Sequence, residues 1–165
     1  MRTKNSRQNA APPKSSAKAY AVRLLSRREY SARALADRLQ AAGYEPDAVA
    51  AALAAMQEYG FQSDERYAEM RARQDGRRMG NRRVAASLVE KGIAKELAAE
   101  QLCTLPPETE RAVDVARRFH GQPLDERLKA KVWRFLSYRG FSPDATKAAL
   151  RSLAKAASDN APDPD

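Results

Sequence analysis

The chain has 165 residues, of which 43% are hydrophobic and only 7% aromatic. Alanine, leucine, arginine and glutamate are abundant, and this composition favours helices over sheets. No apolar run approaches the roughly 20 residues that a membrane-spanning helix needs, and no apolar signal-peptide core follows the basic N-terminus. We therefore expect a soluble, cytoplasmic protein. Cys103 is the single cysteine, which excludes a disulfide framework and a cysteine-rich zinc site within one chain.

The net charge is +9, from 30 Lys and Arg residues against 21 Asp and Glu residues. A basic balance of this size favours polyanionic partners: nucleic acid, an acidic protein surface, or a complex of the two. The alternative is that the charge serves only solubility.

Both ends of the sequence differ from the middle. Residues 1–18 carry basic side chains and no acid, and residues 158–165 carry three aspartates. Neither segment has apolar periodicity, so we predict a disordered basic tail and a disordered acidic tail. The basic tail either adds non-specific affinity for phosphate or has no role in binding.

Between the tails, one pattern returns three times: a leucine, a glycine four residues later, and a second leucine ten residues after the glycine. It occurs at Leu39, Gly43 and Leu53, at Leu88, Gly92 and Leu102, and at Leu136, Gly140 and Leu150. The glycines are 49 and 48 residues apart. Another branched apolar residue precedes each first leucine by four positions, at Leu35, Val84 and Val132. A period of this length indicates a tandem structural repeat.

The spacing indicates that the repeat is helical. Apolar residues four positions apart lie on one face of a helix, and the glycine that follows can adopt the left-handed conformation that ends it. Ser31 is a candidate cap for the middle helix of the first unit, and Ser142 for the last helix of the third. Ala94 occupies the corresponding position in the second unit and predicts the weakest helix start.

The fold prediction is all-α: three tandem three-helix repeats that form an elongated, curved array. The predicted repeats span residues 19–60, 61–105 and 108–157, between the tails at 1–18 and 158–165. A module of under about 50 residues would be marginal alone, whereas stacked modules share faces and offer a long surface for binding.

Catalytic groups are scarce. His120 is the only histidine and fits a helix end better than a general base, and Cys103 fits a small core position. The sequence has no phosphate-binding glycine loop, and its acids are spread over helix surfaces rather than paired for metal chemistry. We expect no enzymatic activity, no cofactor and no metal.

Two stretches are strongly basic: residues 66–91 and residues 111–139 each hold eight cations and three acids. The densest piece is residues 77–83, which we expect to form a loop. Its four arginines suit bidentate contacts to phosphates or carboxylates; the alternative is a solvated connector. Lys91 and Arg139 precede their glycines and either take part in binding or do no more than complement the helix dipole. Tyr138 and Phe141 could stack on bases, although Phe141 fits a buried staple better; Trp133 fits core or edge equally. The candidate filament- or DNA-binding residues are Arg77, Arg78, Arg82, Arg83, Lys91, Arg134, Tyr138 and Arg139.

Several of these pieces resemble the RecX regulators of the bacterial recombinase RecA. The similar segments, in order, are Arg28-Glu29-Tyr30-Ser31, Tyr59-Gly60-Phe61, Asp64-Glu65-Arg66-Tyr67-Ala68, Leu88-Val89-Glu90-Lys91-Gly92-Ile93 and Phe135-Leu136-Ser137-Tyr138-Arg139-Gly140-Phe141-Ser142. Order and spacing fit over about residues 19–155. The chain departs from the pattern at Gln62-Ser63-Asp64 and at Ala94, which puts the helix starts there in doubt.

The resemblance implies a non-enzymatic, monomeric protein that lodges along the groove of the RecA–DNA filament. In most members it implies inhibition of ATP hydrolysis, strand exchange and coprotease activity, and hence a place in recombination, DNA repair and the SOS response. The implied partners are the RecA filament and, without sequence preference, single-stranded or double-stranded DNA, with no membrane. The sequence leaves open whether this member inhibits or assists the recombinase.

The alternative function is that of a stand-alone helical DNA-binding protein, because helix–Gly–helix pairs resemble a helix-turn-helix. Against it, the helix after the turn in the first unit is almost entirely alanine and lacks side chains that read base edges. A third hypothesis is a helical scaffold whose function does not involve DNA.

Overall fold

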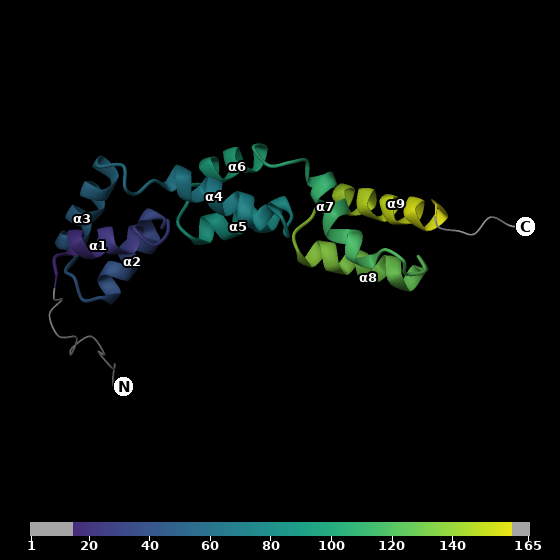
Figure 1. Cartoon of the computed structure of the whole chain (residues 1–165), viewed down its shortest axis with the longest axis horizontal. Helices are drawn as coiled ribbons and strands as arrows, with labels where there is room; N and C mark the ends of the chain where they lie inside the picture. The colour runs from purple at the N-terminus through teal and green to yellow at the C-terminus, as the bar shows by residue number, and fades with distance from the viewer. Residues whose placement is uncertain (1–14, 160–165) are drawn as a thin grey trace, which may run out of the picture. The chain divides into compact units, whose positions relative to one another are not determined.

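The computed structural model describes residues 15–159, in which all regular structure is helical. The first module contains α1 (Ala17–Leu25), α2 (Ala32–Ala41) and α3 (Pro46–Glu58); the second contains α4 (Asp64–Gly76), α5 (Asn81–Glu90) and α6 (Lys95–Cys103). The third contains α7 (Glu108–Ala116), the short 3-10 helix η1 (Arg117–Phe119), α8 (Glu126–Tyr138) and α9 (Pro143–Asp159) (Figure 1). The all-α prediction of three tandem three-helix repeats is confirmed.

The described chain differs from the predicted tails at both ends. The helix α1 begins at Ala17, where the Ser16 hydroxyl caps it by accepting from the Ala19 N–H at 3.2 Å. At the other end α9 continues to Asp159. Residues 17–18 and 158–159 are therefore helical, and the other residues predicted as tail, apart from Ser15 and Ser16, lie outside the described residues. None of the described helices is both long and apolar enough to cross a lipid bilayer.

The contacts divide the chain into two compact units, whose described parts are residues 15–67 and 68–159. The first unit holds the first module and the start of α4. The second holds the rest of the second module and all of the third. The boundary between the two compact units falls within α4. It therefore differs from the boundary between the first and second sequence repeats.

In the first unit, α1 and α2 both pack against α3. Leu35 and Leu39, the predicted stripe of α2, are completely buried, and Val49 of α3 is 3% exposed. Tyr30 is 8% exposed and belongs to the same apolar cluster as Leu35, as expected for a staple that precedes a capped helix. The repeat spacing thus identified the core correctly.

The glycine that ends each middle helix has the predicted left-handed backbone. The φ angles are 89° at Gly43, 88° at Gly92 and 82° at Gly140. One backbone hydrogen bond spans each turn, from the N–H of Tyr44, Ile93 and Phe141 to the carbonyl of Leu39, Leu88 and Leu136, at 3.3, 3.1 and 3.1 Å. The leucine, the glycine and the apolar residue after it are therefore the three parts of one helix-ending motif.

The predicted helix starts are also observed. The Ser31 hydroxyl accepts from the Ala34 N–H, and the Ser142 hydroxyl accepts from the Ala145 N–H, each at 3.2 Å. Ala94 has no side-chain cap, as expected. At the departure from the RecX pattern, α4 nevertheless begins at Asp64, because the Ser63 hydroxyl accepts from the Arg66 N–H at 3.1 Å.

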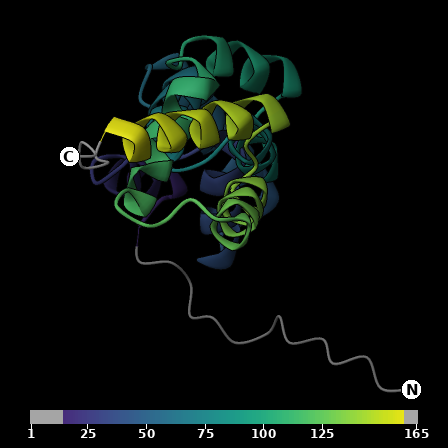
Figure 2. The same cartoon turned by 90° about the vertical axis from the view of Figure 1, so that its right-hand side faces the viewer.

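In the third module, α9 packs along α7 and also contacts α8 (Figures 1 and 2). Val132 and Leu136 of α8 are completely buried and Phe141 is 4% exposed, so Phe141 is a core staple and is not available to stack on a base. Trp133 is 38% exposed and lies at the edge of the module. The prediction for Cys103 was wrong: this residue ends α6 on the exposed side of the helix.

Candidate functional site

The most basic loop, residues 77–80 between α4 and α5, is fixed to the third module by one arginine of α7. The Arg111 guanidinium donates to the carbonyl oxygens of Gly76 at 3.0 Å, Met79 at 2.8 Å and Pro106 at 3.0 Å. It also donates to the Asn81 side-chain oxygen at the start of α5. One planar side chain therefore holds both ends of the loop.

Arg111 is unusual because it is a buried charge, only 6% exposed. Burial lowers the pKa of its guanidinium, and the nearby Glu108 carboxylate partly opposes that shift. Glu108 accepts from the Asn81 N–H at 2.7 Å, so both residues of α7 contact the first residue of α5. The sequence analysis counted Arg111 only as one cation in a basic stretch. Its position directly before Ala112, which is buried with Ala116 on the packed face of α7, was the available signal.

The backbone of the same loop is in direct contact with the backbone at the end of α8. The Gly80 N–H donates to the Arg139 carbonyl at 2.9 Å, and the Arg139 guanidinium donates to the Arg78 carbonyl at 3.1 Å. A Cβ atom on Gly80 would overlap the carbonyl group of Gly140. Gly80 is thus required here by proximity rather than by its φ of −77°, which any residue can adopt.

Arg82 and Arg83, at the start of α5, also contact the end of α8. The Arg82 guanidinium donates to the Ser137 carbonyl at 3.0 Å, one of the carbonyls that a helix end leaves without a helical partner. The Arg83 guanidinium lies 5.3 Å from the centre of the Tyr138 ring. Tyr138 is 76% exposed, so most of its ring faces solvent.

Tyr138 continues a basic stripe along α8. Four exposed residues follow one another at helical spacing and form what we call the α8 stripe: Arg127, Lys131, Arg134 and Tyr138. None of the three cations forms an ion pair with a described residue, and no acid occupies this face of α8. Glu126 pairs instead with Lys129 on another face, at 2.7 Å. An aromatic ring at the end of an unneutralised cationic row is typical of surfaces that bind single-stranded nucleic acid.

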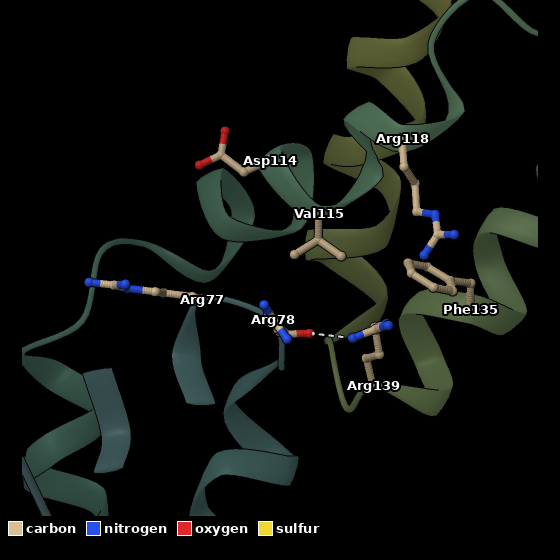
Figure 3. Close-up of a pocket in the computed structure, with 7 residues that line it drawn as sticks. All are labelled: Arg77, Arg78, Asp114, Val115, Arg118, Phe135 and Arg139. Carbon is tan, nitrogen blue, oxygen red and sulfur yellow. Dashed lines mark hydrogen bonds between the residues drawn. The ribbon is translucent and has the colours of Figure 1, made fainter. Parts of the chain in front are cut away.

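A second basic surface is concave. A hollow of about 400 Å³, which we call the joint hollow, lies where loop 77–80 meets α7 and α8 (Figure 3). Its lining residues are Arg77, Arg78, Asp114, Val115, Arg118, Phe135 and Arg139. The Arg139 and Arg118 guanidinium carbons lie 4.4 Å and 5.1 Å from the centre of the Phe135 ring. Arg77 extends away from the other arginines in this view.

The structure brings most of the predicted site residues to one region but divides them between two surfaces. Arg77, Arg78 and Arg139 line the joint hollow, whereas Arg134 and Tyr138 belong to the α8 stripe and Arg82 and Arg83 lie beside its end. Lys91 is apart from both: it follows the ten-residue α5, so it lies about 15 Å along the helix from the basic loop. The prediction missed Arg118 and Phe135. Phe135 lies four residues before Arg139, so helical spacing was an available signal for it, whereas Arg118 of η1 reaches these residues only when the third module folds.

Comparison with known proteins divides the chain into the same three helix triplets. Three family models match in order: the first three-helix domain of RecX over residues 17–55, the second over 63–102 and the third over 107–150. A "Regulatory protein RecX" from Chromohalobacter salexigens is 38% identical over 133 residues, covering 79% of this chain and 88% of that protein. One from Herbaspirillum seropedicae is 37% identical over 142 residues, covering 85% and 92%.

Solved structures show the same fold. The crystal structure of RecX from Lactobacillus salivarius matches with a TM-score of 0.74 at 20% identity, covering 84% of this chain and 95% of that one. A second structure, of a regulatory protein RecX, matches with a TM-score of 0.68 at 23% identity, covering 81% and 71%. The three helix triplets each coincide with one matched family model. This protein belongs to the RecX family of regulatory proteins.

Proposed function

We propose that this protein modulates, and in the first instance inhibits, the recombinase RecA by binding along the groove of the RecA–DNA filament. Membership of a family named for regulation is the observation that carries this proposal. On this proposal it is a cytoplasmic monomer, not an enzyme, that reduces ATP hydrolysis, strand exchange and coprotease function in DNA repair, recombination and the SOS response.

The α8 stripe is the surface that we assign to DNA in this complex. Its three cations are exposed and have no acidic partner among the described residues, so they can neutralise phosphates without first breaking an ion pair. Tyr138 adds a ring on which a base can stack whatever its identity. Binding of this kind is independent of sequence.

Contacts from more than one module would link neighbouring recombinase subunits. ATP hydrolysis and disassembly require those subunits to move, so a protein attached at several points would resist the motion. Multipoint attachment would also make inhibition depend strongly on salt.

The test is single-strand-dependent ATP hydrolysis by RecA, titrated with the full chain. We expect substoichiometric protein to lower the hydrolysis rate and change filament lifetime. The triple variant Arg127→Gln, Lys131→Gln, Arg134→Gln should inhibit ATP hydrolysis at least about tenfold more weakly, because three phosphate contacts are lost. A matched variant, Arg73→Gln, Arg117→Gln, Lys147→Gln, removes the same charge from residues already paired with Glu69, Asp114 and Asp144 and should stay near the parent. No change in hydrolysis or filament lifetime would reject the proposal.

A stand-alone DNA-binding function has less support. Outside the buried positions of α3, the helix that would enter the groove carries mainly alanines, with Asp47 and Glu58 as its charged residues. Selection of a defined duplex sequence from a random pool would favour that function, whereas weak and sequence-blind binding would favour the proposal above.

A further inference from the structure

The joint hollow has a different chemistry from the α8 stripe. We propose that it is a carboxylate-binding site, and that its ligand is an acidic segment of a protein partner rather than a nucleic-acid strand. The proposal concerns the hollow alone and goes beyond the function proposed above, because it holds whichever protein supplies the acidic segment.

The arginines of the hollow are held in place without being neutralised. The Arg139 guanidinium donates one N–H to the Arg78 carbonyl at 3.1 Å and lies 4.4 Å from the centre of the Phe135 ring. The Arg118 guanidinium lies 5.1 Å from the same ring and 5.7 Å from that of Phe119. Neither forms an ion pair with a described residue, so most of their N–H donors remain available. Arginines positioned in this way lose little conformational freedom when an anion binds.

The loop that carries Arg77 and Arg78 is equally fixed. Buried Arg111 anchors it through the carbonyls of Gly76 and Met79, and the Gly80 N–H anchors it to α8 at 2.9 Å. The two side chains themselves are exposed and make no hydrogen bond to a described residue. A rigid backbone thus presents free guanidinium groups at the rim of the hollow.

The side chains that line the hollow are predominantly positive. They include four arginines and one acid, Asp114. Asp114 is paired with Arg117 at 3.0 Å, and its side chain is 62% exposed, so it does not neutralise the arginines of the hollow. A bound anion would reduce the mutual repulsion of Arg78, Arg118 and Arg139, which water otherwise screens.

Two observations favour carboxylates over the phosphates of a strand. The Phe135 ring, the aromatic group of the hollow, is already contacted by two guanidinium groups and forms a T-shaped pair with Phe119 at 5.3 Å between ring centres. It therefore offers no free face on which a base can stack, unlike Tyr138. In addition, the surface is a hollow of about 400 Å³ with Val115 and Phe135 in its wall. Those dimensions and that apolar wall suit one or two acidic side chains with their methylene groups, and each carboxylate can take two parallel N–H donors from an arginine.

The experiment compares two probes on the full-length protein by fluorescence anisotropy: a fluorescein-labelled hexaglutamate peptide and a fluorescein-labelled dT12 oligonucleotide. The variant Arg78→Gln, Arg118→Gln should raise the Kd for hexaglutamate by about tenfold or more, because bidentate donors are lost, and that for dT12 by less than about threefold. The control Arg73→Gln, Lys147→Gln removes equal charge from exposed, paired positions and should change the Kd for hexaglutamate by less than about twofold. The α8-stripe triple variant should lose more affinity for dT12 than for hexaglutamate.

A second variant fills the hollow from within. Val115 lines the hollow and is half-buried, so Val115→Glu places a carboxylate beside the arginines and should abolish hexaglutamate binding while leaving dT12 binding. The proposal is overturned if the parent protein does not bind hexaglutamate, if the control loses as much peptide affinity as the hollow variant, or if the hollow variant loses more dT12 than peptide affinity. No recombinase is present, so the hexaglutamate results do not depend on the function proposed above; the result for the α8-stripe variant tests the DNA assignment separately.

Discussion

Two glycines show how the same residue type is required for different reasons. Gly60 has a φ of 68° and nothing within 4 Å of an added Cβ, so its requirement is conformational. Gly80 has an ordinary φ of −77°, but an added Cβ would overlap the backbone of Gly140. The glycine that ends α8 is crowded in turn, since its own Cβ would lie 2.7 Å from that of Arg83.

Substitution should separate the two requirements. Gly80→Ala should lower the free energy of unfolding of the second unit by about 1–3 kcal/mol, because the added methyl group must push the loop away from α8. Gly60→Ala should cost the first unit about 1–2 kcal/mol through its left-handed backbone. Urea unfolding followed by circular dichroism measures both.

Asparagine provides the control, because it tolerates a left-handed backbone but not an overlap. Gly60→Asn should recover part of the stability lost in Gly60→Ala, whereas Gly80→Asn should be no better than Gly80→Ala. Equal recovery at both positions would contradict the distinction.

At the scale of elements, the start of a middle helix is completed by the next module. The Asp64 carboxylate, at the start of α4, accepts from the N–H of Ala32, the first residue of α2, at 2.8 Å. The Glu108 carboxylate, at the start of α7, accepts from the N–H of Asn81, the first residue of α5, at 2.7 Å. The requirement is greater at α5, whose N-cap is Gly80 and has no side chain of its own to offer.

Asp64→Ala and Glu108→Ala should therefore each lower the free energy of unfolding by about 1–2 kcal/mol, as loss of a helix cap does. Hydrogen exchange should accelerate at the amides of Ala32 and Asn81 respectively. Asp47→Ala and Glu96→Ala remove first-turn acids from α3 and α6 and should cost only about 0.5 kcal/mol through the helix dipole. If these controls cost as much, the interaction is with the dipole alone.

The sequence predicted what depends on local spacing and missed what depends on contact between modules. The stripe of Leu35 and Leu39 and the turn at Gly43 were predictable because a helix places residues four apart on one face and a left-handed position favours glycine. Arg118 could not be grouped with Phe135 and Arg139, since η1 meets α8 only after the third module has folded. Cys103 was assigned to the core from its apolar neighbours, but the helix turns it outward.

At the scale of the whole molecule, the described residues contain two separate apolar clusters that lie in different units. One contains Leu35 and Leu39 of the first module, and the other contains Val132 and Leu136 of the third. The single tryptophan, Trp133, is in the second unit and is 38% exposed, so its fluorescence reports on that unit.

A core truncation in the first unit should therefore have little effect on the urea transition that Trp133 fluorescence reports. Leu136→Ala should shift the urea transition seen by Trp133 fluorescence by the equivalent of about 2–5 kcal/mol, as a cavity of that size does. Leu35→Ala should lower stability by a similar amount in circular dichroism but shift the fluorescence transition by much less. Coincident shifts in both signals for both variants would show that the two units unfold as one.

The caps provided by Asp64 and Glu108 also bear on the order in which the chain is made. During translation the residues of the first module are added before Asp64, and those of α5 are added before Glu108. Each of these modules therefore waits for its successor before its middle helix gains that last hydrogen bond. The third module differs, because the Asp125 carboxylate directly precedes α8 and accepts from the Leu128 N–H at 2.7 Å. The middle helix of the third module is therefore capped from within its own module and does not depend on a later segment for this hydrogen bond.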